Sequence, residues 1–294
     1  MVEGNSFGLK IFKLANYVFL ISLSLLCILP LINILAISFS SNTAVASGEV
    51  TFWPVGWTTA SYQLILDNPQ FLNAIGVTIQ RVVLGVSINL LLTILIAYPL
   101  SKEVNVFRMR TFYAWFFVFT MLFGGGLIPW YMVVKNTGLL DTIWALVLPG
   151  AVPVFNVVLL LNFFRGIPKE LEEAAFMDGA GHWTILWRIY VPLALPALAT
   201  IFLFSIVGHW NSWFDGIIFM NSPENYPLQS YLQTIIIQRD LSQITSDEID
   251  ALLNVSDRTS KAAQIFVGAL PILLVYPFLQ KYFMKGIVMG SVKE

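Results

Sequence analysis

Six long apolar stretches constrain this chain more than any other feature of its sequence. A helix that crosses a hydrocarbon core of about 30 Å needs roughly 20 predominantly apolar residues. Runs such as Val157–Leu161 are apolar on every side, unlike the alternating strands of a membrane barrel, and a helix satisfies its own backbone hydrogen bonds in lipid. We therefore expect an all-α membrane protein with six transmembrane helices. The stretches are Tyr17–Phe39, Val82–Leu100, Thr111–Val134, Thr142–Phe164, Val191–Met220 and Ala262–Phe283.

The composition excludes several other classes of protein. Hydrophobic residues make up 57% of the chain and charged residues only 11%, whereas a soluble domain carries about a quarter charged residues. Cys27 is the single cysteine, which excludes a disulfide scaffold and a multi-cysteine metal site. The net charge of −1 gives no reason to expect a nucleic-acid partner.

The positions of the basic residues predict the orientation. With these spans, eleven of the 16 Lys and Arg residues fall on the side of both termini. Because cytoplasmic loops carry the excess of Lys and Arg, we expect both termini in the cytoplasm. The predicted organisation is a cytoplasmic segment 1–16, a membrane domain 17–284 with a cytoplasmic loop 165–190 and an external loop 221–261, and a cytoplasmic tail 285–294.

Motifs for catalysis and nucleotide binding are missing from the sequence. It contains no G-x-x-x-x-G-K-[ST], H-E-x-x-H or G-x-S-x-G, and its two histidines, His182 and His209, are far apart. We expect no catalytic residue, no metal site and no cofactor in this chain. Gly124–Gly126 has no following lysine and lies within a span, where it indicates close helix packing or a local break of the helix.

Polar residues recur on one face of two spans. Asn89 lies in such a stripe of the second span, and Asp215 lies near the outer end of the fifth, where we expect an interfacial carboxylate. Such stripes pack helices together, but aromatic rings beside amides and a carboxylate also suit a path for a sugar. The candidate path residues are Asn89, His209, Trp210, Asn211, Trp213 and Asp215.

The loop between the fourth and fifth spans has the pattern of a short helix-turn-helix. Pro168 suits a first helical position, Glu170 suits the positive end of the helix dipole, and Gly179 can end the helix in a left-handed turn. A second short helix is predicted over 182–190. We expect a rigid element at the membrane surface.

This loop also carries a recognisable signature. The residues Glu173-Ala174-Ala175, then Gly179, Ile189 and Val191-Pro192 match the pattern E-A-A, three residues, G, nine residues, I-x-L-P, with Val191 in place of leucine. In this signature the chain resembles the permease subunits of ATP-binding-cassette (ABC) importers.

Further motifs refine the resemblance. Asp178-Gly179-Ala180, Trp210-Asn211 and the ending 285–293 are similar to the second permease of maltose-importer-like, carbohydrate-uptake heterodimers. The segments 124–131 and 138–142 resemble the subgroup that handles polysaccharide and uronate oligosaccharides such as alginate or aldouronate.

The resemblance implies a type I ABC importer permease fold and a role in oligosaccharide import. Partner ATPases would bind ATP and Mg, and this chain would catalyse nothing. The expected partners are a second permease, two ATPase subunits, an extracytoplasmic solute-binding protein and the oligosaccharide. The loop residues expected to couple to the ATPase are Glu170, Glu173, Ala174, Ala175, Met177, Asp178, Gly179 and Ala180. Those expected to contact the binding protein are Asn221, Tyr226, Arg239 and Asp240.

Two other functions stay open at this point. A permease of a peptide or amino-acid ABC importer would carry the same loop signature. A stand-alone secondary carrier would need ionisable residues near the membrane midplane, which the spans largely lack. Dependence on a binding protein would place the chain in a prokaryotic plasma membrane.

Overall fold

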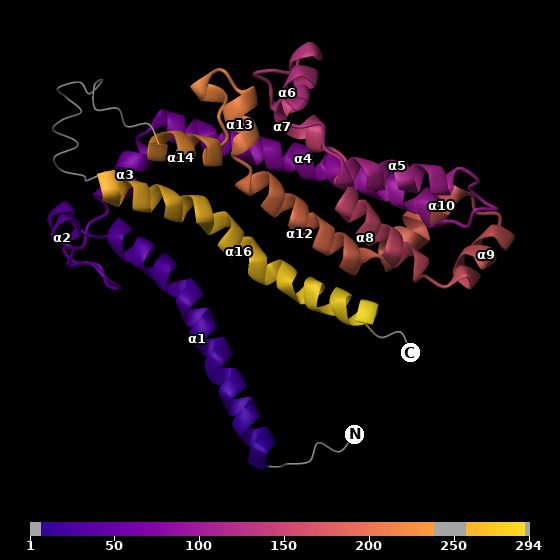
Figure 1. Cartoon of the computed structure of the whole chain (residues 1–294), viewed down its shortest axis with the longest axis horizontal. Coiled ribbons are helices and arrows are strands. Elements are labelled where there is room, and N and C mark those ends of the chain that lie inside the picture. The colour runs from indigo at the N-terminus through magenta and orange to yellow at the C-terminus, as the bar shows by residue number, and fades with distance from the viewer. Residues whose placement is uncertain (1–6, 238–256, 292–294) are drawn as a thin grey trace. The chain divides into compact units, whose positions relative to one another are not determined.

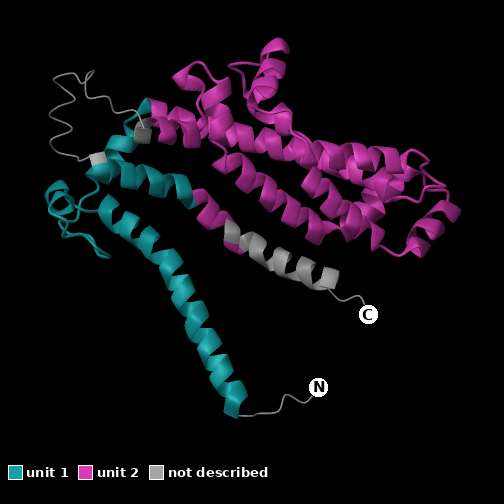
Figure 2. Cartoon of the chain, in the orientation of Figure 1, with its two compact units in different colours: residues 1–69, 235–270 teal, residues 70–234, 271–294 magenta. Residues whose placement is uncertain are grey.

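The computed structural model describes residues 7–237 and 257–291, and every regular element in these ranges is a helix (Figure 1). The chain divides into two compact units, residues 1–69 with 235–270 and residues 70–234 with 271–294 (Figure 2).

The first unit contains the N-terminal helix and the short helices that follow it. Its elements are α1 (Phe7–Ser38), α2 (Asn42–Ala46), α3 (Ala60–Leu66) and the start of α16 (Asp257–Ser291). The most hydrophobic stretch of α1 has no buried residue, so this stretch contributes apolar surface, whereas Ile37 near the end of the helix packs with Val45 and Ala262.

Polar contacts order the segment after α1. The hydroxyls of Ser38 and Tyr62 are 2.7 Å apart, and the Thr259 hydroxyl donates to Asn42 Oδ1 at 3.0 Å. The Phe39 ring stacks on Trp57 with centroids 4.7 Å apart. These contacts hold the 40–60 segment against the ends of α1 and α16.

The second unit carries the remaining helices. They are α4 (Pro69–Ser101), α5 (Arg110–Leu122), α6 (Leu127–Asn136), α7 (Ile143–Val147), η1 (Leu148–Gly150), α8 (Val154–Arg165), α9 (Lys169–Met177), α10 (His182–Ile185), the π-helix η2 (Leu186–Tyr190), α11 (Val191–Leu193), α12 (Leu195–Asn211), α13 (Phe214–Phe219), η3 (Pro223–Asn225) and α14 (Leu228–Ile237). The last three residues of α14 fall in the first unit, and α16 continues into the second.

Three helices in the described ranges are long and apolar enough to cross a membrane, or up to six if each bent pair is one span. The bends are 114° between α5 and α6, 45° between the 143–150 and 154–165 segments, and 80° between the 182–193 and 195–211 segments. The second break contains Pro153, and Pro192 and Pro196 flank the third break. These prolines favour the breaks because proline removes a helical hydrogen bond. The structure therefore has about six candidate spans, of which half are interrupted.

Gly124–Gly126 breaks the predicted third span. Gly126 has φ +86°, which favours glycine, and it precedes α6 directly. Of the two roles expected for this triplet, the structure shows the helix break. Several helix ends also differ from the expected ranges. Helix α1 begins at Phe7 and α4 at Pro69, before the expected starts, and α16 begins at Asp257 and continues to Ser291 through most of the expected tail.

The core of the second unit lies among α4, α8, η2 and α12 (Figure 1). Ala97, Leu160 and Ile201 are fully buried there, and Ala194 is fully buried at the 80° bend. Between helices in lipid, small side chains allow close backbone approach, and packing replaces the hydrophobic effect as the driving force. This core fixes the two regions in which the candidate residues lie.

Candidate functional site

The signature loop folds into α9, as the sequence predicts. The sequence predicts Pro168 at the first helical position, but in the structure it occupies the N-cap position, directly before the helix begins. At the other end, the Ala180 N–H donates to the Ala175 carbonyl at 2.9 Å and the Gly179 N–H donates to the Phe176 carbonyl at 3.0 Å. Gly179 has φ +79°, so a left-handed glycine ends α9 in a Schellman motif.

The residues of the signature divide between two faces of α9. Glu170, Glu173, Ala174, Met177 and Asp178 are exposed, Met177 by 88% of its surface. The half-buried Ala175 and Ala180 pack against the α4–α8–η2–α12 core. The loop thus has a docked face and a free face that combines carboxylates, alanine and methionine.

A lysine fastens the docked face of α9 to the end of α4. Lys102 Nζ donates to the two carboxylate oxygens of Glu172 at 2.7 and 2.8 Å, and the Tyr190 hydroxyl donates to the same carboxylate at 2.6 Å. Lys102 Nζ also lies 4.0 Å from the ring centroids of both Tyr98 and Tyr190, a distance suited to cation–π attraction. Burial lowers the pKa of Lys102, and Glu172 opposes that shift.

Sequence analysis missed this cluster. Lys102 and Glu172 are 70 positions apart, so no local pattern in the sequence pairs them. A second, exposed pair, Lys169–Glu103, joins the same segments. The pair lowers the pKa of Glu103 and raises that of Lys169, in each case chiefly through their hydrogen bond.

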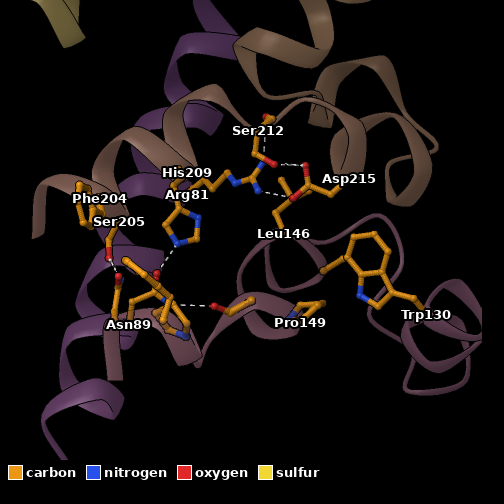
Figure 3. Close-up of a pocket in the computed structure, with 16 residues that line it drawn as sticks. Arg81, Asn89, Trp130, Leu146, Pro149, Phe204, Ser205, His209, Ser212 and Asp215 are labelled. Carbon is orange, nitrogen blue, oxygen red and sulfur yellow. Dashed lines mark hydrogen bonds and ion pairs between the residues drawn. The ribbon is translucent and has the colours of Figure 1, made fainter. Parts of the chain in front are cut away.

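A cavity of about 660 Å³ lies in the second unit among α4, the α7–α8 break and α12–α13 (Figure 3). The Asn89 amide donates to the carbonyls of Gly150 and Ala151, both at 2.9 Å, where the α7–α8 pair is unwound. His209 Nε2 lies 2.8 Å from Asn89 Oδ1. Asn89 therefore satisfies the backbone groups that the helix break leaves free.

Arg81 and Asp215 form a buried ion pair in the wall of this cavity. Arg81 Nη1 donates to Asp215 Oδ1 at 3.1 Å, Nη2 donates to Oδ2, and Nη1 also donates to the Ser212 carbonyl at 3.3 Å. Asp215 is 9% exposed and Arg81 2%. Asp215 is thus a buried partner of arginine, which corrects the expectation of an interfacial carboxylate.

Three of the six candidate path residues line the cavity, namely Asn89, His209 and Asp215. Trp210 is buried outside the lining, while Asn211 and Trp213 are exposed and also lie outside it. Sequence analysis did not predict the further lining residues Arg81, Trp130, Phe155, Asn156, Phe204 and Ser205 as path residues. A polar stripe reveals one helix face, but it does not tell which other elements face it.

The segment after α13 is held by Asp141. Its carboxylate accepts from the Asn221 and Ser222 N–H groups at 3.0 and 3.2 Å, from the Ser222 hydroxyl at 2.9 Å and from the Asn225 amide at 3.1 Å. These bonds, led by that of Asn225, lower the pKa of Asp141 to about 2. Asn221 is exposed and Tyr226 half-buried, whereas the predicted contacts Arg239 and Asp240 lie outside the described residues.

The combination of an exposed signature helix and a cavity among interrupted spans agrees with one known family. The sequence profile described as "Binding-protein-dependent transport system inner membrane component" matches residues 98–288. The chain belongs to this family. It is a multi-pass inner membrane protein and a non-catalytic permease subunit of an ABC importer that works with a binding protein.

Individual relatives are similar along almost the whole chain. Protein LplC of Bacillus subtilis (strain 168) is 40% identical over 97% of this chain and 95% of its own length. The polygalacturonan/rhamnogalacturonan transport system permease protein YtcP of the same strain is 38% identical, over 97% and 99%.

A solved structure is also similar. It is a chain of a bacterial ABC transporter involved in the import of the acidic polysaccharide alginate. It is 35% identical, superimposes with a TM-score of 0.89, and is matched over 96% of this chain and 100% of that chain. These findings confirm the predicted permease fold and the resemblance to carbohydrate-uptake permeases.

Proposed function

We propose that the chain imports oligosaccharides, specifically fragments of acidic polysaccharides, by alternating access in a heterodimer with a second permease. Two cytoplasmic ATPases would drive the change, and both termini of this chain would lie on their side of the membrane. The observation that carries the proposal is α9. This helix presents Glu173 and Ala174 of the signature on an exposed face, while the Lys102–Glu172 contact fastens its other face to the end of α4.

The geometry of α9 suits the transfer of a movement. The Schellman motif and the Lys102–Glu172 contact make α9 and the end of α4 one rigid element. A partner subunit bound to Glu173, Ala174 and Met177 would therefore move α4 together with α9. Helix α4 carries Asn89 and Arg81, which lie in the cavity wall. Rigid-body motion of packed helices is a common basis of such transitions.

The substrate class rests on the relatives and on the cavity. Polygalacturonan and alginate, named for two relatives, are both polymers of uronic acids. The cavity of this chain presents the rings of Trp130, Phe155 and Phe204 beside the polar groups of Asn89 and His209. Flat apolar faces with a few placed polar groups are what a sugar-binding surface needs.

On the outer side, we assign contact with the binding protein to the segment that follows α13. Asp141 fixes the start of this segment, residues 221–225, and leaves the Asn221 side chain exposed. A preformed surface reduces the ordering cost of binding a partner.

A peptide or amino-acid importer is the alternative within the same family, and the ligand retained by the binding protein separates the two. The decisive experiment is purification of this chain from its native membrane, followed by ATPase assays with binding protein loaded with oligogalacturonate, maltotriose or a peptide. We expect co-purification of a second permease and an ATPase, and stimulation by the oligogalacturonate complex. Stimulation by the peptide complex alone would refute the substrate class, and purification as a single chain would refute the importer.

A further inference from the structure

Arg81 has hydrogen-bonding capacity that the described part of the chain does not use. Its guanidinium has five N–H donors, and the described contacts go from Nη1 to two acceptors and from Nη2 to one. Arg81 Nε is buried and has no hydrogen-bond partner among the residues that the structure describes. An unsatisfied buried donor costs roughly 1–3 kcal/mol, so the site is incomplete as it stands.

Asp215 can release Arg81 without losing all its partners. Its Oδ1 also accepts from the Ser212 hydroxyl at 2.9 Å and from the Gly216 N–H at 3.0 Å. Ser212 lies in the turn between α12 and α13, and Asp215 and Gly216 are the second and third residues of α13. The carboxylate would therefore stay hydrogen-bonded in place while the arginine turned to another acceptor.

The surroundings of Arg81 define what that acceptor can be. Arg81 is the one cation among the described residues that line the cavity, and Figure 3 shows its guanidinium between His209 and Asp215. The aromatic rings of Trp130 and Phe204 also line the cavity, on opposite sides of Arg81 in Figure 3. A planar guanidinium pairs with a carboxylate through two parallel hydrogen bonds, which a neutral hydroxyl cannot accept.

We propose that Arg81 recognises the carboxylate of a uronic acid residue as it passes through the cavity, and that Asp215 occupies Arg81 between passages. The inference rests on the proposed import of acidic oligosaccharides and assigns the acidic specificity to one residue of this chain.

Competition from Asp215 has a use in transport. A buried arginine without a partner would bind a carboxylate too tightly to release it, and conduction requires sites that a substrate can leave. Because Asp215 re-forms its pair with Arg81, the departing carboxylate is replaced and no charge stays buried alone. The pair thus makes recognition weak and reversible.

The proposal is tested by measuring how sugars bind to the assembled importer in lipid nanodiscs, in the absence of the binding protein. The binding is measured by saturation-transfer NMR. The probes are trigalacturonate and the same trisaccharide with its carboxyl groups reduced to alcohols. We expect wild type to bind trigalacturonate, Asp215→Asn to bind it about tenfold more tightly, and the charge-neutral double variant Arg81→Gln/Asp215→Asn to lose at least tenfold. The reduced trisaccharide should bind all three equally.

Arg81→Lys is the second variant, because it keeps the charge and the ion pair but loses the planar fork. It should bind trigalacturonate several-fold more weakly than wild type, even if the double variant does not assemble. Equal trigalacturonate binding by wild type and Arg81→Lys, or a parallel loss of both sugars in the double variant, would overturn the proposal. So would the absence of trigalacturonate binding to wild type.

A separate measurement distinguishes this failure from failure of the proposed function. If Arg81 has no recognition role, the wild-type importer still takes up uronate oligosaccharides in vesicles with ATP and binding protein. If the proposed function is wrong, that uptake is itself missing.

Discussion

Replacement of Lys102 by methionine should loosen α9 without disturbing the spans. Removal of one partner from a fully buried ion pair costs roughly 3–5 kcal/mol. Here the Glu172 side chain is 15% exposed and keeps the Tyr190 hydroxyl as a donor, and methionine retains the packing of the lysine stem. We therefore expect the opening of α9 to become easier by about 2–3 kcal/mol.

Amide hydrogen exchange on the assembled importer measures this opening directly. Since 1.4 kcal/mol corresponds to a factor of ten, the amides of α9 should exchange roughly 30- to 140-fold faster in Lys102→Met, and those in the middle of α4 should exchange at the wild-type rate. Lys169→Met is the matched control, because it removes the exposed pair with Glu103 and exposed pairs contribute little. The double variant Lys102→Met/Glu172→Gln should lie closer to wild type than Lys102→Met, since no carboxylate loses its cation.

Two results would contradict this reasoning. One is wild-type protection of α9 in Lys102→Met, which would mean that packing alone holds the helix. The other is an equal effect of Lys169→Met, which would mean that burial of the pair is irrelevant.

Three further predictions follow from single contacts. The folded-state pKa of Asp141 is lowered to about 2, whereas the pKa of an aspartate in the unfolded chain is about 4. The ionised carboxylate therefore stabilises the fold above about pH 4, and this stabilisation is lost as the pH falls towards 2. The difference in melting temperature between wild type and Asp141→Asn should shrink over that window. Gly85→Ala would place a Cβ on the His209 ring, whereas the Cβ of Gly76→Ala in the same helix meets nothing within 4 Å. Thermal unfolding should show that Gly85→Ala lowers the free energy of unfolding by about 1–3 kcal/mol and that Gly76→Ala does not lower it. Glu173→Lys, on the free face of α9, should abolish ATP-driven uptake while the chain still inserts in the membrane, and normal uptake would refute its role in coupling.

Local chemistry explains how much of α9 was predictable. Glu170 in the first turn and Gly179 after the last turn are signals within a dozen residues, and both act in the structure as expected. Gly124–Gly126 is a local signal of the same kind, although the sequence did not decide between packing and a break. Such features need no knowledge of the rest of the chain.

The cavity was less predictable because its contacts join distant parts of the chain. Arg81 and Asp215 are separated by 134 positions and Asn89 and His209 by 120. A polar residue in a span predicts that a partner exists, but the identity of the partner depends on how the interrupted helices pack. For that reason the periodic stripe found Asn89 and Asp215 and missed Arg81.

We propose above that this chain forms part of an ATP-driven path for acidic oligosaccharides. Uptake of labelled oligogalacturonate into vesicles that contain the assembled importer and its binding protein tests it most directly, with ATP hydrolysis recorded in the same sample. We expect uptake only with ATP, and hydrolysis that rises with the loaded binding protein. Uptake at the same rate without ATP would contradict it and favour a secondary carrier.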